Sequence, residues 1–343
     1  MNGLLSMRAT ALKLNHWMLV LLGVSVTLLL HAAFASARGQ EVAAYPSRPV
    51  HIIVPSAAGG TTDIVARVIA QALTRSLGVT FIVEQKVGGN TNIGSAFVSK
   101  AAPDGYTLLV NTDTLTSNAS MYKNPGYDVV TGFAPVSMLT VASGALAVRK
   151  NLEVANLTDF VELARKQGKA LSMASTGNGT VSHLTSLMFR QRIGLSEWTE
   201  VPYQGSAKVV TDLVGGHVDA AVAMIAPFVQ PAQSGDMRLL AVTTKARSPA
   251  APDVPTIAES TQLKDFDVAN WTAMLAPPGT PEPIVAKLAA AVEAALKDAE
   301  VLKAFSALGL APADAGPKAL AQSLRDNIAQ WRAVVDRARL SPI

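Results

Sequence analysis

The sequence contains no cysteine among its 343 residues, which excludes disulfide bonds, thiolate nucleophiles, iron–sulfur clusters and cysteine-ligated zinc. It is also poor in charge: charged residues make up 16%, and 29 Lys and Arg against 25 Asp and Glu leave a net charge of +4. No run of basic residues marks a nucleic-acid-binding face, so we expect no nucleic-acid partner. Hydrophobic residues make up 49%, which is ample for a core, and the length suits two ordinary domains or one large one.

The first residues have the features of a signal peptide. Arg8 and Lys13 precede an apolar run at 17–30, which at about fourteen residues is shorter than the roughly twenty that a spanning helix needs. Small residues follow, and we place cleavage after Ala37. We therefore expect 1–37 to be removed and the mature chain to be exported to the periplasm. The alternative is an uncleaved N-terminal anchor.

Beyond this leader, short apolar runs alternate with stretches of helical periodicity. This order predicts an α/β fold with parallel strands and helices on both faces of each sheet. We expect strands at 50–54, 81–83, 106–110, 146–148, 171–174, 218–223, 239–243 and 271–276 with a strand end at 201, and helices at 64–77, 93–100, 157–167, 181–192, 207–214, 319–339 and from 281 onward.

The α/β rhythm restarts in the middle of the chain, which indicates two units with the second inserted into the first. We expect lobe 1 at 45–142 and 270–343, and lobe 2 at 143–269. The two joining segments would lie near 141–145 and 268–275. The predicted fold is thus two parallel-sheet lobes joined by a two-segment hinge.

Three loops at the predicted ends of strands are poor in long side chains and lead into helices. They are 55–62, 175–182 and 203–207, and they are rich in Gly, Ser and Thr. Open parallel sheets bind ligands at the carboxyl ends of their strands. The first N–H groups of a helix lack intrahelical partners and carry partial positive charge, so such loops bind anions without Arg or Lys. A small carboxylate held between opposed lobes fits this chemistry best.

Two phosphate-binding patterns are only partly matched. The glycines at 89–95 have P-loop spacing, but Ser95 stands where the lysine belongs. The segment 177–182 lacks the third glycine of a dinucleotide fingerprint. Gly, Ser and Thr are also ordinary loop and cap residues, so any one of the three loops could be purely structural.

Other polar residues have both a structural and a functional interpretation. Asn111, Thr112 and Thr114 end a predicted strand and could line the cleft. His183 could contact ligand or be buried with a hydrogen-bond partner. Asp63 is interpreted as a first-turn acid that the helix dipole favours. We interpret Trp271 as a core residue.

A hydrolase is the main alternative from another functional class, with a receptor-docking sensor as a further one. The sequence has no G-x-S-x-G elbow, and Ser182 and His183 are adjacent, which is a weak basis for a catalytic triad. The histidines that remain after the leader, His51, His183 and His217, lack metal-ligand spacing. We therefore expect no catalysis, metal or cofactor.

The mature chain resembles the substrate-binding proteins of tripartite tricarboxylate transporters, also called the Bug family, from about Tyr45 to the last helix. The segments that carry the resemblance are YPSRPVHIIVP (45–55), AGGTTDIVAR (58–67), APDGYTLL (102–109), GFAPVS (132–137), STGNGTVSHL (175–184), VPYQGSA (201–207), RSPAAPDVPTIAE (247–259) and LAPPGTP (275–281). The resemblance implies a type II periplasmic binding protein, whose two lobes close on a small carboxylate and which delivers it to a membrane permease.

The resemblance also implies that the first loop grips one carboxylate through backbone amides and bridging waters. We expect a monomer and the following ligand-binding set: Ser56, Ala57, Ala58, Gly59, Gly60, Thr61, Thr62, Asn111, Thr112, Ser175, Thr176, Gly177, Asn178, Gly179, Thr180, Ser182, His183, Tyr203, Gly205, Ser206 and Ala207. The sequence departs from the family pattern at Ser56, where an aromatic is common, at 85–87, where Asn-Arg-Pro is common, and at Lys208, where proline is common. Ser56 removes apolar cover from the cleft mouth, and Lys208 would add a cation near it.

Overall fold

The computed structural model describes residues 44–342, apart from the side chains of 314 and 315. Residues 48–342 belong to one compact unit, which contains every described helix and strand. The predicted signal peptide at 1–37 lies outside the described residues. No helix within residues 44–342 is both long and apolar enough to cross a membrane.

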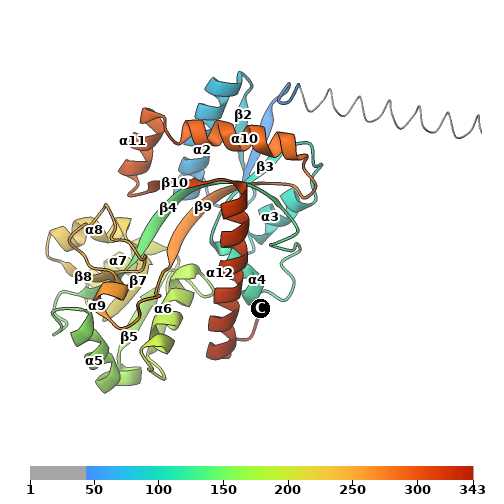
Figure 1. Ribbon diagram of the computed structural model, residues 1–343. Coiled ribbons are helices and arrows are strands. Elements are labelled where there is room, and N and C mark those ends of the chain that lie inside the picture. The colour runs from blue at the N-terminus through green and yellow to red at the C-terminus, as the bar shows by residue number, and fades with distance from the viewer. Residues whose placement is uncertain (1–43, 343) are drawn as a thin grey trace, which may run out of the picture. The chain divides into compact units, whose positions relative to one another are not determined.

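Strands and helices alternate along most of the described chain (Figure 1). The strands are β1 (Val50–Val54), β2 (Phe81–Gln85), β3 (Thr107–Thr112), β4 (Ala134–Arg149), β5 (Ser172–Ser175), β6 (Thr199–Pro202), β7 (Ala220–Met224), β8 (Met237–Val242), β9 (Ala269–Ala276) and β10 (Ala311–Ala315). The helices are α2 (Thr61–Leu77), α3 (Asn92–Ser99), α4 (Thr114–Met121), α5 (Leu157–Gln167), the 3-10 helix η1 (Gly168–Ala170), α6 (Val181–Arg192), α7 (Ser206–Val214), α8 (Ala226–Gln233), α9 (Ile257–Ser260), α10 (Glu282–Ala295), α11 (Ala299–Ala307) and α12 (Pro317–Ala338).

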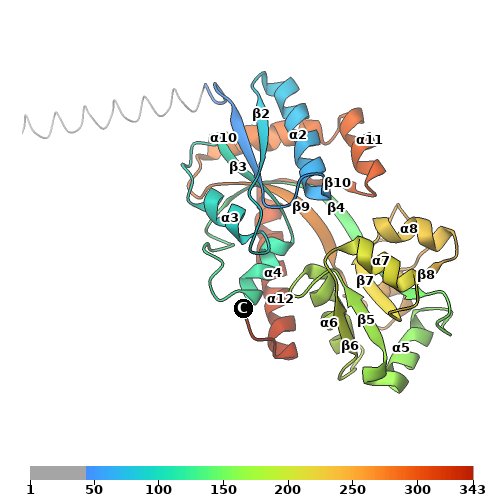
Figure 2. The same cartoon turned by 180° about the vertical axis from the view of Figure 1, so that it is seen from behind.

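The strands form two groups that share β4. Along the sheet the order is β2-β1-β3-β9-β4-β7-β5-β6, and β8 and β10 also pair with β4. Residues 134–143 of β4 pair with β9, whereas residues 144–148 pair with β7. Figure 2 shows β4 and β9 running between the two groups of elements. The long strand β4 therefore connects the two halves of the fold.

Parallel pairing is confined to the outer strands of each group. β1 pairs in parallel with β2 and β3, and β5 with β6 and β7, as the βαβ rhythm predicts. β9 pairs antiparallel with both β3 and β4, while β7, β8 and β10 run antiparallel to β4. The sheets are therefore mixed, because the chain crosses along β4 and returns along β9 in the opposite direction.

The helix α2 shows how local sequence determines its packing. Val65, Ile69 and Leu73 recur every four residues and are fully buried, so they form one apolar face. Burying each such side chain contributes about 1.5–3 kcal/mol relative to leaving it exposed. The helix ends at Gly78, whose φ of 70° is the left-handed conformation that glycine adopts without a Cβ clash.

The C-terminal helix α12 packs against both halves of the fold. Leu320 and Leu324 belong to a core cluster with residues of β3 and β9. About two to three turns after Leu324, Trp331 and Val335 belong to the core cluster that contains residues of α5 and α6. In Figure 1, α12 runs from the first group of elements to a position beside α6. This helix and β4 are both continuous between the halves.

The α/β class and most expected elements are confirmed. The bounds expected for the strand at 50–54 and for the helices at 157–167 and 181–192 agree with the structure. The strand expected at 146–148 is the end of the 16-residue β4, whose pairing with β9 shifts register twice. The elements that the pattern did not predict are α4, α8, α9, β10 and the first half of β4.

Candidate ligand-binding site

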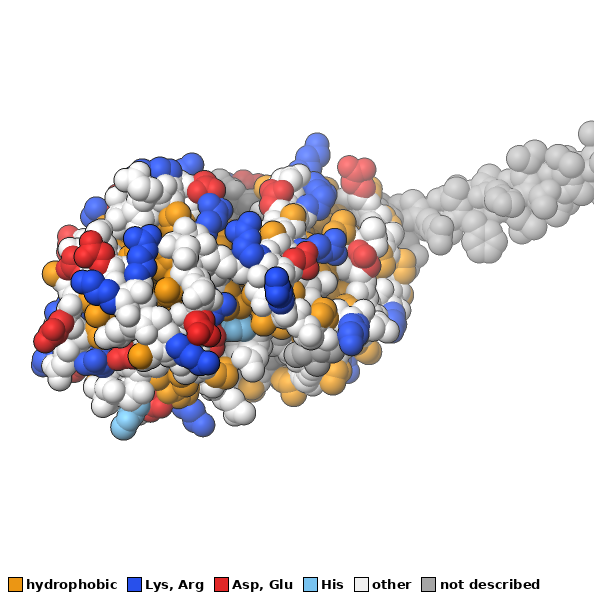
Figure 3. Space-filling view, turned by 90° about the horizontal axis from the view of Figure 1, so that it is seen from below, with side chains coloured by type: hydrophobic (Ala, Val, Ile, Leu, Met, Phe, Trp, Pro, Cys, Tyr) orange, Lys and Arg blue, Asp and Glu red, His pale blue; other side chains and the backbone are white. Residues whose placement is uncertain are grey.

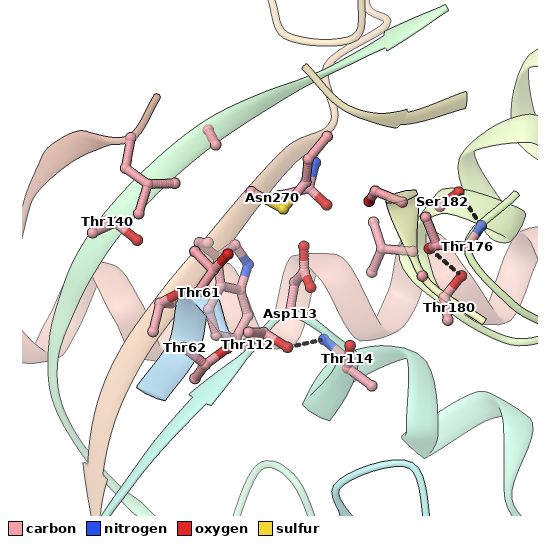
Figure 4. Close-up of a pocket in the computed structure, with 18 residues that line it drawn as sticks. Thr61, Thr62, Thr112, Asp113, Thr114, Thr140, Thr176, Thr180, Ser182 and Asn270 are labelled. Carbon is pink, nitrogen blue, oxygen red and sulfur yellow. Dashed lines mark hydrogen bonds between the residues drawn. The ribbon is translucent and has the colours of Figure 1, made fainter. Parts of the chain in front are cut away.

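A cavity of about 310 Å³ lies where the two groups of strands meet. It is lined by Thr61, Thr62, Thr112, Asp113, Thr114, Thr140, Ala142, Thr176, Thr180, Val181, Ser182, Gly205, Ser206, Met224, Asn270, Trp271, Thr272 and Leu310. Figure 4 shows Thr176, Thr180 and Ser182 on one side of the cavity, with Thr61, Thr62, Thr112 and Thr140 on the other. The lining is dominated by hydroxyl groups and contains no Lys, Arg or His among the described residues.

The N-terminus of α2 reaches the cavity at Thr61 and Thr62. Its N-cap residue, Gly60, has no side chain to hydrogen-bond to the first turn. The first N–H groups of this helix therefore lack both intrahelical acceptors and a side-chain cap. A helix start of this kind, with its dipole, is chemically suited to an anion.

Asp63 fixes the loop that precedes α2. Its Oδ2 accepts hydrogen bonds from the Gly59 N–H at 2.9 Å and the Arg67 Nε at 3.0 Å, and its Oδ1 accepts from the Gln85 Nε2 at 2.6 Å. Burial alone would raise the pKa of this carboxyl, but the bonds from Arg67, Gly59 and Gln85 outweigh it and hold the pKa below its usual value. Asp63 is thus an ionised anchor for the loop, in agreement with its interpretation as a structural acid.

The loop before α6 is held by its own hydroxyl groups. Thr180 is the N-cap: its Oγ1 accepts from the His183 N–H at 3.4 Å and donates to the Gly177 carbonyl at 2.7 Å. Ser182 Oγ accepts from the Thr176 N–H at 3.0 Å and donates to the Val222 carbonyl at 2.5 Å. This end of the cavity therefore presents a pre-formed loop with one helical N–H already capped.

The helix α7 reaches the cavity at Ser206, directly after Gly205. Gly205 is its N-cap with a φ of 97°, a conformation that disfavours residues with a Cβ, and it makes no side-chain cap. Nearby, the Tyr203 hydroxyl donates to Asp212 Oδ2 at 2.6 Å. The helices α2 and α7 therefore bring two uncapped N-termini to the cavity from the two halves of the fold.

A fourth helix, α4, also begins at the cavity, and the sequence pattern did not predict it. Asp113 is its N-cap, and both Asp113 and Thr114 line the cavity. Burial raises the pKa of the Asp113 carboxyl to about 7, while the backbone N–H groups of Trp271 and Thr114 act in the opposite direction. Asp113 is the one ionisable side chain among the lining residues that the structure describes.

His183 is buried beside the second loop and does not line the cavity. Its Nδ1 accepts the Gly179 N–H at 3.2 Å, which fixes Nδ1 as the unprotonated ring nitrogen. Burial, with a contribution from the positive charge of Arg190, lowers the pKa of His183 to about 4. These contacts support a structural role for His183.

Eight of the predicted ligand-binding residues line the cavity: Thr61, Thr62, Thr112, Thr176, Thr180, Ser182, Gly205 and Ser206. The others lie outside the lining: Ser56, Ala57, Ala58, Gly59, Gly60, Asn111, Ser175, Gly177, Asn178, Gly179, His183, Tyr203 and Ala207. Asn111 lies outside the lining because alternate residues of β3 face opposite sides of the sheet. It is buried, and its amide donates to Ser95 Oγ at 3.0 Å.

Thr114, which the sequence indicated as a possible cleft residue, also lines the cavity. The lining residues that sequence reasoning missed are Asp113, Thr140, Ala142, Val181, Met224, Asn270, Trp271, Thr272 and Leu310. Most of them belong to β4, to β9 or to the start of α4, and no Gly-rich loop marks these elements in the sequence. Trp271 is both core and lining: it is 4% exposed, and its Nε1 donates to Asn327 Oδ1 at 2.8 Å. The three departures from the family pattern, Ser56, 85–87 and Lys208, do not line the cavity.

On the face shown in Figure 3, acidic and basic side chains are interspersed. Within residues 44–342, no group of three or more His, Asp or Glu side chains is placed to hold a metal ion.

An α/β fold of two strand groups with a hydroxyl-lined cavity at their junction is the arrangement of a ligand-binding protein. A family model described as "Tripartite tricarboxylate transporter family receptor" matches residues 65–340. The chain belongs to this family, which confirms the resemblance seen in the sequence.

Similar proteins agree with this assignment. A UPF0065 protein from the TAR-I ttuE-ttuC' intergenic region of Agrobacterium vitis is 36% identical over 316 residues, which cover 91% of each chain. Among solved structures, MatC from Rhodopseudomonas palustris with bound malate is 33% identical and has a TM-score of 0.71. The match covers 85% of this chain and 100% of the MatC chain. R. palustris Rpa4515 with adipate is 33% identical and has a TM-score of 0.75. The match covers 87% of this chain and 100% of the Rpa4515 chain.

Proposed function

We propose that this protein is an exported solute-binding protein that captures a small organic carboxylate and delivers it to a tripartite tricarboxylate-type membrane transporter. The observation that carries the proposal is the pair of uncapped helix N-termini, of α2 and α7, at one cavity. Malate and adipate in two related structures support the ligand class. The signal peptide at 1–37, with cleavage near Ala37, would bring the mature chain, as a monomer, to the periplasm.

Capture would follow from the division of the cavity lining between two lobes. We assign 45–142 and 270–343 to lobe 1 and 143–269 to lobe 2, with β4 and β9 as the crossing segments. A ligand that contacts both lobes binds the closed state better than the open state and so shifts the equilibrium toward closure. Because α12 packs on both halves, its second half would have to slide or bend when the lobes separate.

The contacts of Ser182 argue against the hydrolase alternative. Its hydroxyl donates to the Val222 carbonyl, and the adjacent His183 uses Nδ1 as an acceptor for the Gly179 N–H. The hydroxyl is therefore engaged by the backbone, and the neighbouring histidine uses its unprotonated nitrogen for another bond. The family description, a transporter receptor, also favours binding without turnover.

Ligand screening of the mature protein, residues 38–343, tests the proposal. Thermal-shift measurements with mono-, di- and tricarboxylates of four to six carbons are followed by mass spectrometry of any molecule that co-purifies. A true ligand raises the unfolding midpoint in a concentration-dependent manner, and a micromolar dissociation constant corresponds to about −8 kcal/mol. Absence of any carboxylate hit, together with binding of a neutral or cationic molecule, would contradict the proposal.

Delivery to a transporter needs its own experiment. Cells that lack the gene for this protein are assayed for uptake of the radiolabelled ligand, with the wild-type gene restored in the control. The proposal predicts that restoration of the gene restores uptake. Normal uptake without the gene, or loss of a ligand-dependent signalling response in place of uptake, would favour the sensor alternative.

A further inference from the structure

Asp113 is a buried carboxyl group at the wall of the cavity with an oxygen that no described group satisfies. Its relative exposure is 6%, and its Oδ2 is buried without a hydrogen-bond partner. Figure 4 shows its carboxyl group between the Thr112 side and the Thr176–Thr180 side of the cavity. A buried charged group without a partner is costly, so such a group calls for a specific explanation.

The backbone around Asp113 is fixed on three sides. Its N–H donates to the Trp271 carbonyl at 3.1 Å, and its carbonyl accepts from the Thr116 N–H at 2.9 Å and the Thr116 hydroxyl at 2.6 Å. The bond to Trp271 attaches the start of α4 to the crossing strand β9, and the two bonds from Thr116 fix Asp113 to the first turn of α4. The carboxyl group is therefore held at the cavity wall by rigid elements.

Two hydroxyl groups of the cavity lining are committed to other acceptors: Thr180 donates to the Gly177 carbonyl, and Ser182 donates to the Val222 carbonyl. No Lys, Arg or His is among the described residues that line the cavity. A positive charge beside Asp113 would therefore have to come from the ligand itself.

We propose that the ligand is an amino-carboxylate, whose ammonium group pairs with Asp113 while its carboxylate occupies the uncapped helix N-termini. This inference rests on the proposed function and specifies its substrate class. A dicarboxylate without a donor would bring further negative charge into a cavity that already holds a buried acid and no cation. An ammonium group removes that conflict, because a buried charge pair with good hydrogen bonds compensates the desolvation of both partners.

The raised pKa of Asp113 agrees with this role. A carboxyl group that burial holds at about 7 in the empty cavity becomes fully ionised when a cation binds beside it. A hydroxyl group on the ligand would also satisfy Oδ2, but it would leave the charge uncompensated.

Three matched series of acids separate these chemistries. Each has one carbon skeleton with hydrogen, hydroxyl or ammonium at carbon 2: succinate, malate and aspartate; glutarate, 2-hydroxyglutarate and glutamate; 3-phenylpropionate, 3-phenyllactate and phenylalanine. Calorimetry at pH 8 compares the wild type with Asp113→Asn, and with Asp326→Asn as a matched change at an exposed acid of α12.

We expect an amino acid to bind the wild type and Asp326→Asn at least about tenfold more tightly than its hydroxy and unsubstituted counterparts. In Asp113→Asn this preference should fall to about one. Equal or tighter binding of the unsubstituted or the hydroxy acid by the wild type would overturn the inference and leave the proposed function intact. An unchanged preference in Asp113→Asn would do the same, and so would failure of all nine acids to bind the wild type when another carboxylate of the ligand screen binds it. If Asp113→Asn does not fold, the wild-type series alone decides.

Discussion

The backbone N–H of Asp113 donates to the carbonyl of Trp271 at 3.1 Å, which joins the start of α4 to the crossing strand β9. Both residues line the cavity, and both belong to elements that lie beside the predicted hinge. The ionisable group of the candidate site is therefore placed by the strand that connects the halves of the fold. Its position should be sensitive to any rearrangement of that strand.

Replacement of Asp113 by Asn should stabilise the ligand-free protein at alkaline pH. The pKa of Asp113 is about 7 in the folded state, above its ordinary value of 3.8, so its ionisation opposes folding. The wild type therefore loses stability from this group as the pH rises from 3.8 through 7, by at most about 4 kcal/mol at pH 8.

Chemical denaturation of the wild type and Asp113→Asn at pH 4 and pH 8 measures this effect. The stability advantage of the variant should be small at pH 4 and largest at pH 8. An advantage that is equal at both pH values would show that Asp113 is not held near neutrality. A stabilised variant that binds ligand less well is the expected signature of a functional acid rather than a structural one.

His183 should make the protein less stable as the pH falls from about 6.5 to about 4. Its pKa is lowered to about 4 by burial and by Arg190, so in this window the unfolded chain binds a proton that the folded chain does not. The loss is at most about 3 kcal/mol. Denaturation curves of the wild type and His183→Asn between pH 4 and 7.5 should diverge toward acid pH. Parallel pH dependences in the two proteins would rule out this contribution of His183.

Replacement of the cap residue Thr180 by Ala should reduce both stability and binding. The variant loses the Oγ1 that accepts the His183 N–H and donates to the Gly177 carbonyl, at a cost of about 1 kcal/mol to folding. It also loosens the loop that brings Thr176 and Thr180 to the cavity, so the affinity for ligand should fall severalfold.

The matched control is Thr256→Ala. Thr256 caps α9 in the same way, with its side chain accepting the Glu259 N–H at 2.9 Å, and it does not line the cavity. Both variants should lose similar stability by thermal denaturation, but Thr256→Ala should keep wild-type affinity in calorimetry. Equal affinities in the two variants would exclude the 175–182 loop from binding.

The sequence predicted the elements whose signals are local. The helix α6 has the bounds 181–192 expected from the α/β rhythm, and the structure shows that Thr180 caps it. The loops before α2, α6 and α7 were predicted to meet ligand because Gly, Ser and Thr gather before helices, and each loop contributes to the cavity lining.

The sequence did not predict the elements and site residues whose structure depends on contacts between residues distant in the chain. The helix α4, with the sequence TLTSNASM, has few strong helix formers and is supported by packing against α12 and by its attachment to β9. The helix α8 contains Pro231, which a pattern treats as a helix breaker. Asp113 was missed for the same reason, because a single acid after a strand becomes notable only when its burial and its unpaired oxygen are known.

The central claim is that main-chain N–H groups bind the carboxylate, and Thr61 allows its most direct test. Thr61 is the first residue of α2, where proline is well tolerated because that N–H has no intrahelical acceptor. Gly60 before it is extended, at φ −72° and ψ 162°, which suits a residue that precedes proline. Thr61→Pro thus removes the N–H and the side chain, whereas Thr61→Ala removes the side chain alone.

Calorimetry of these two variants with the acid identified by the ligand screen is the decisive measurement. The account predicts that Thr61→Pro folds normally and binds about 10- to 150-fold more weakly than Thr61→Ala, the effect of one hydrogen bond to a charged group. Equal affinities of Thr61→Pro and Thr61→Ala would contradict the claim, because the N–H of residue 61 would then contribute nothing to binding.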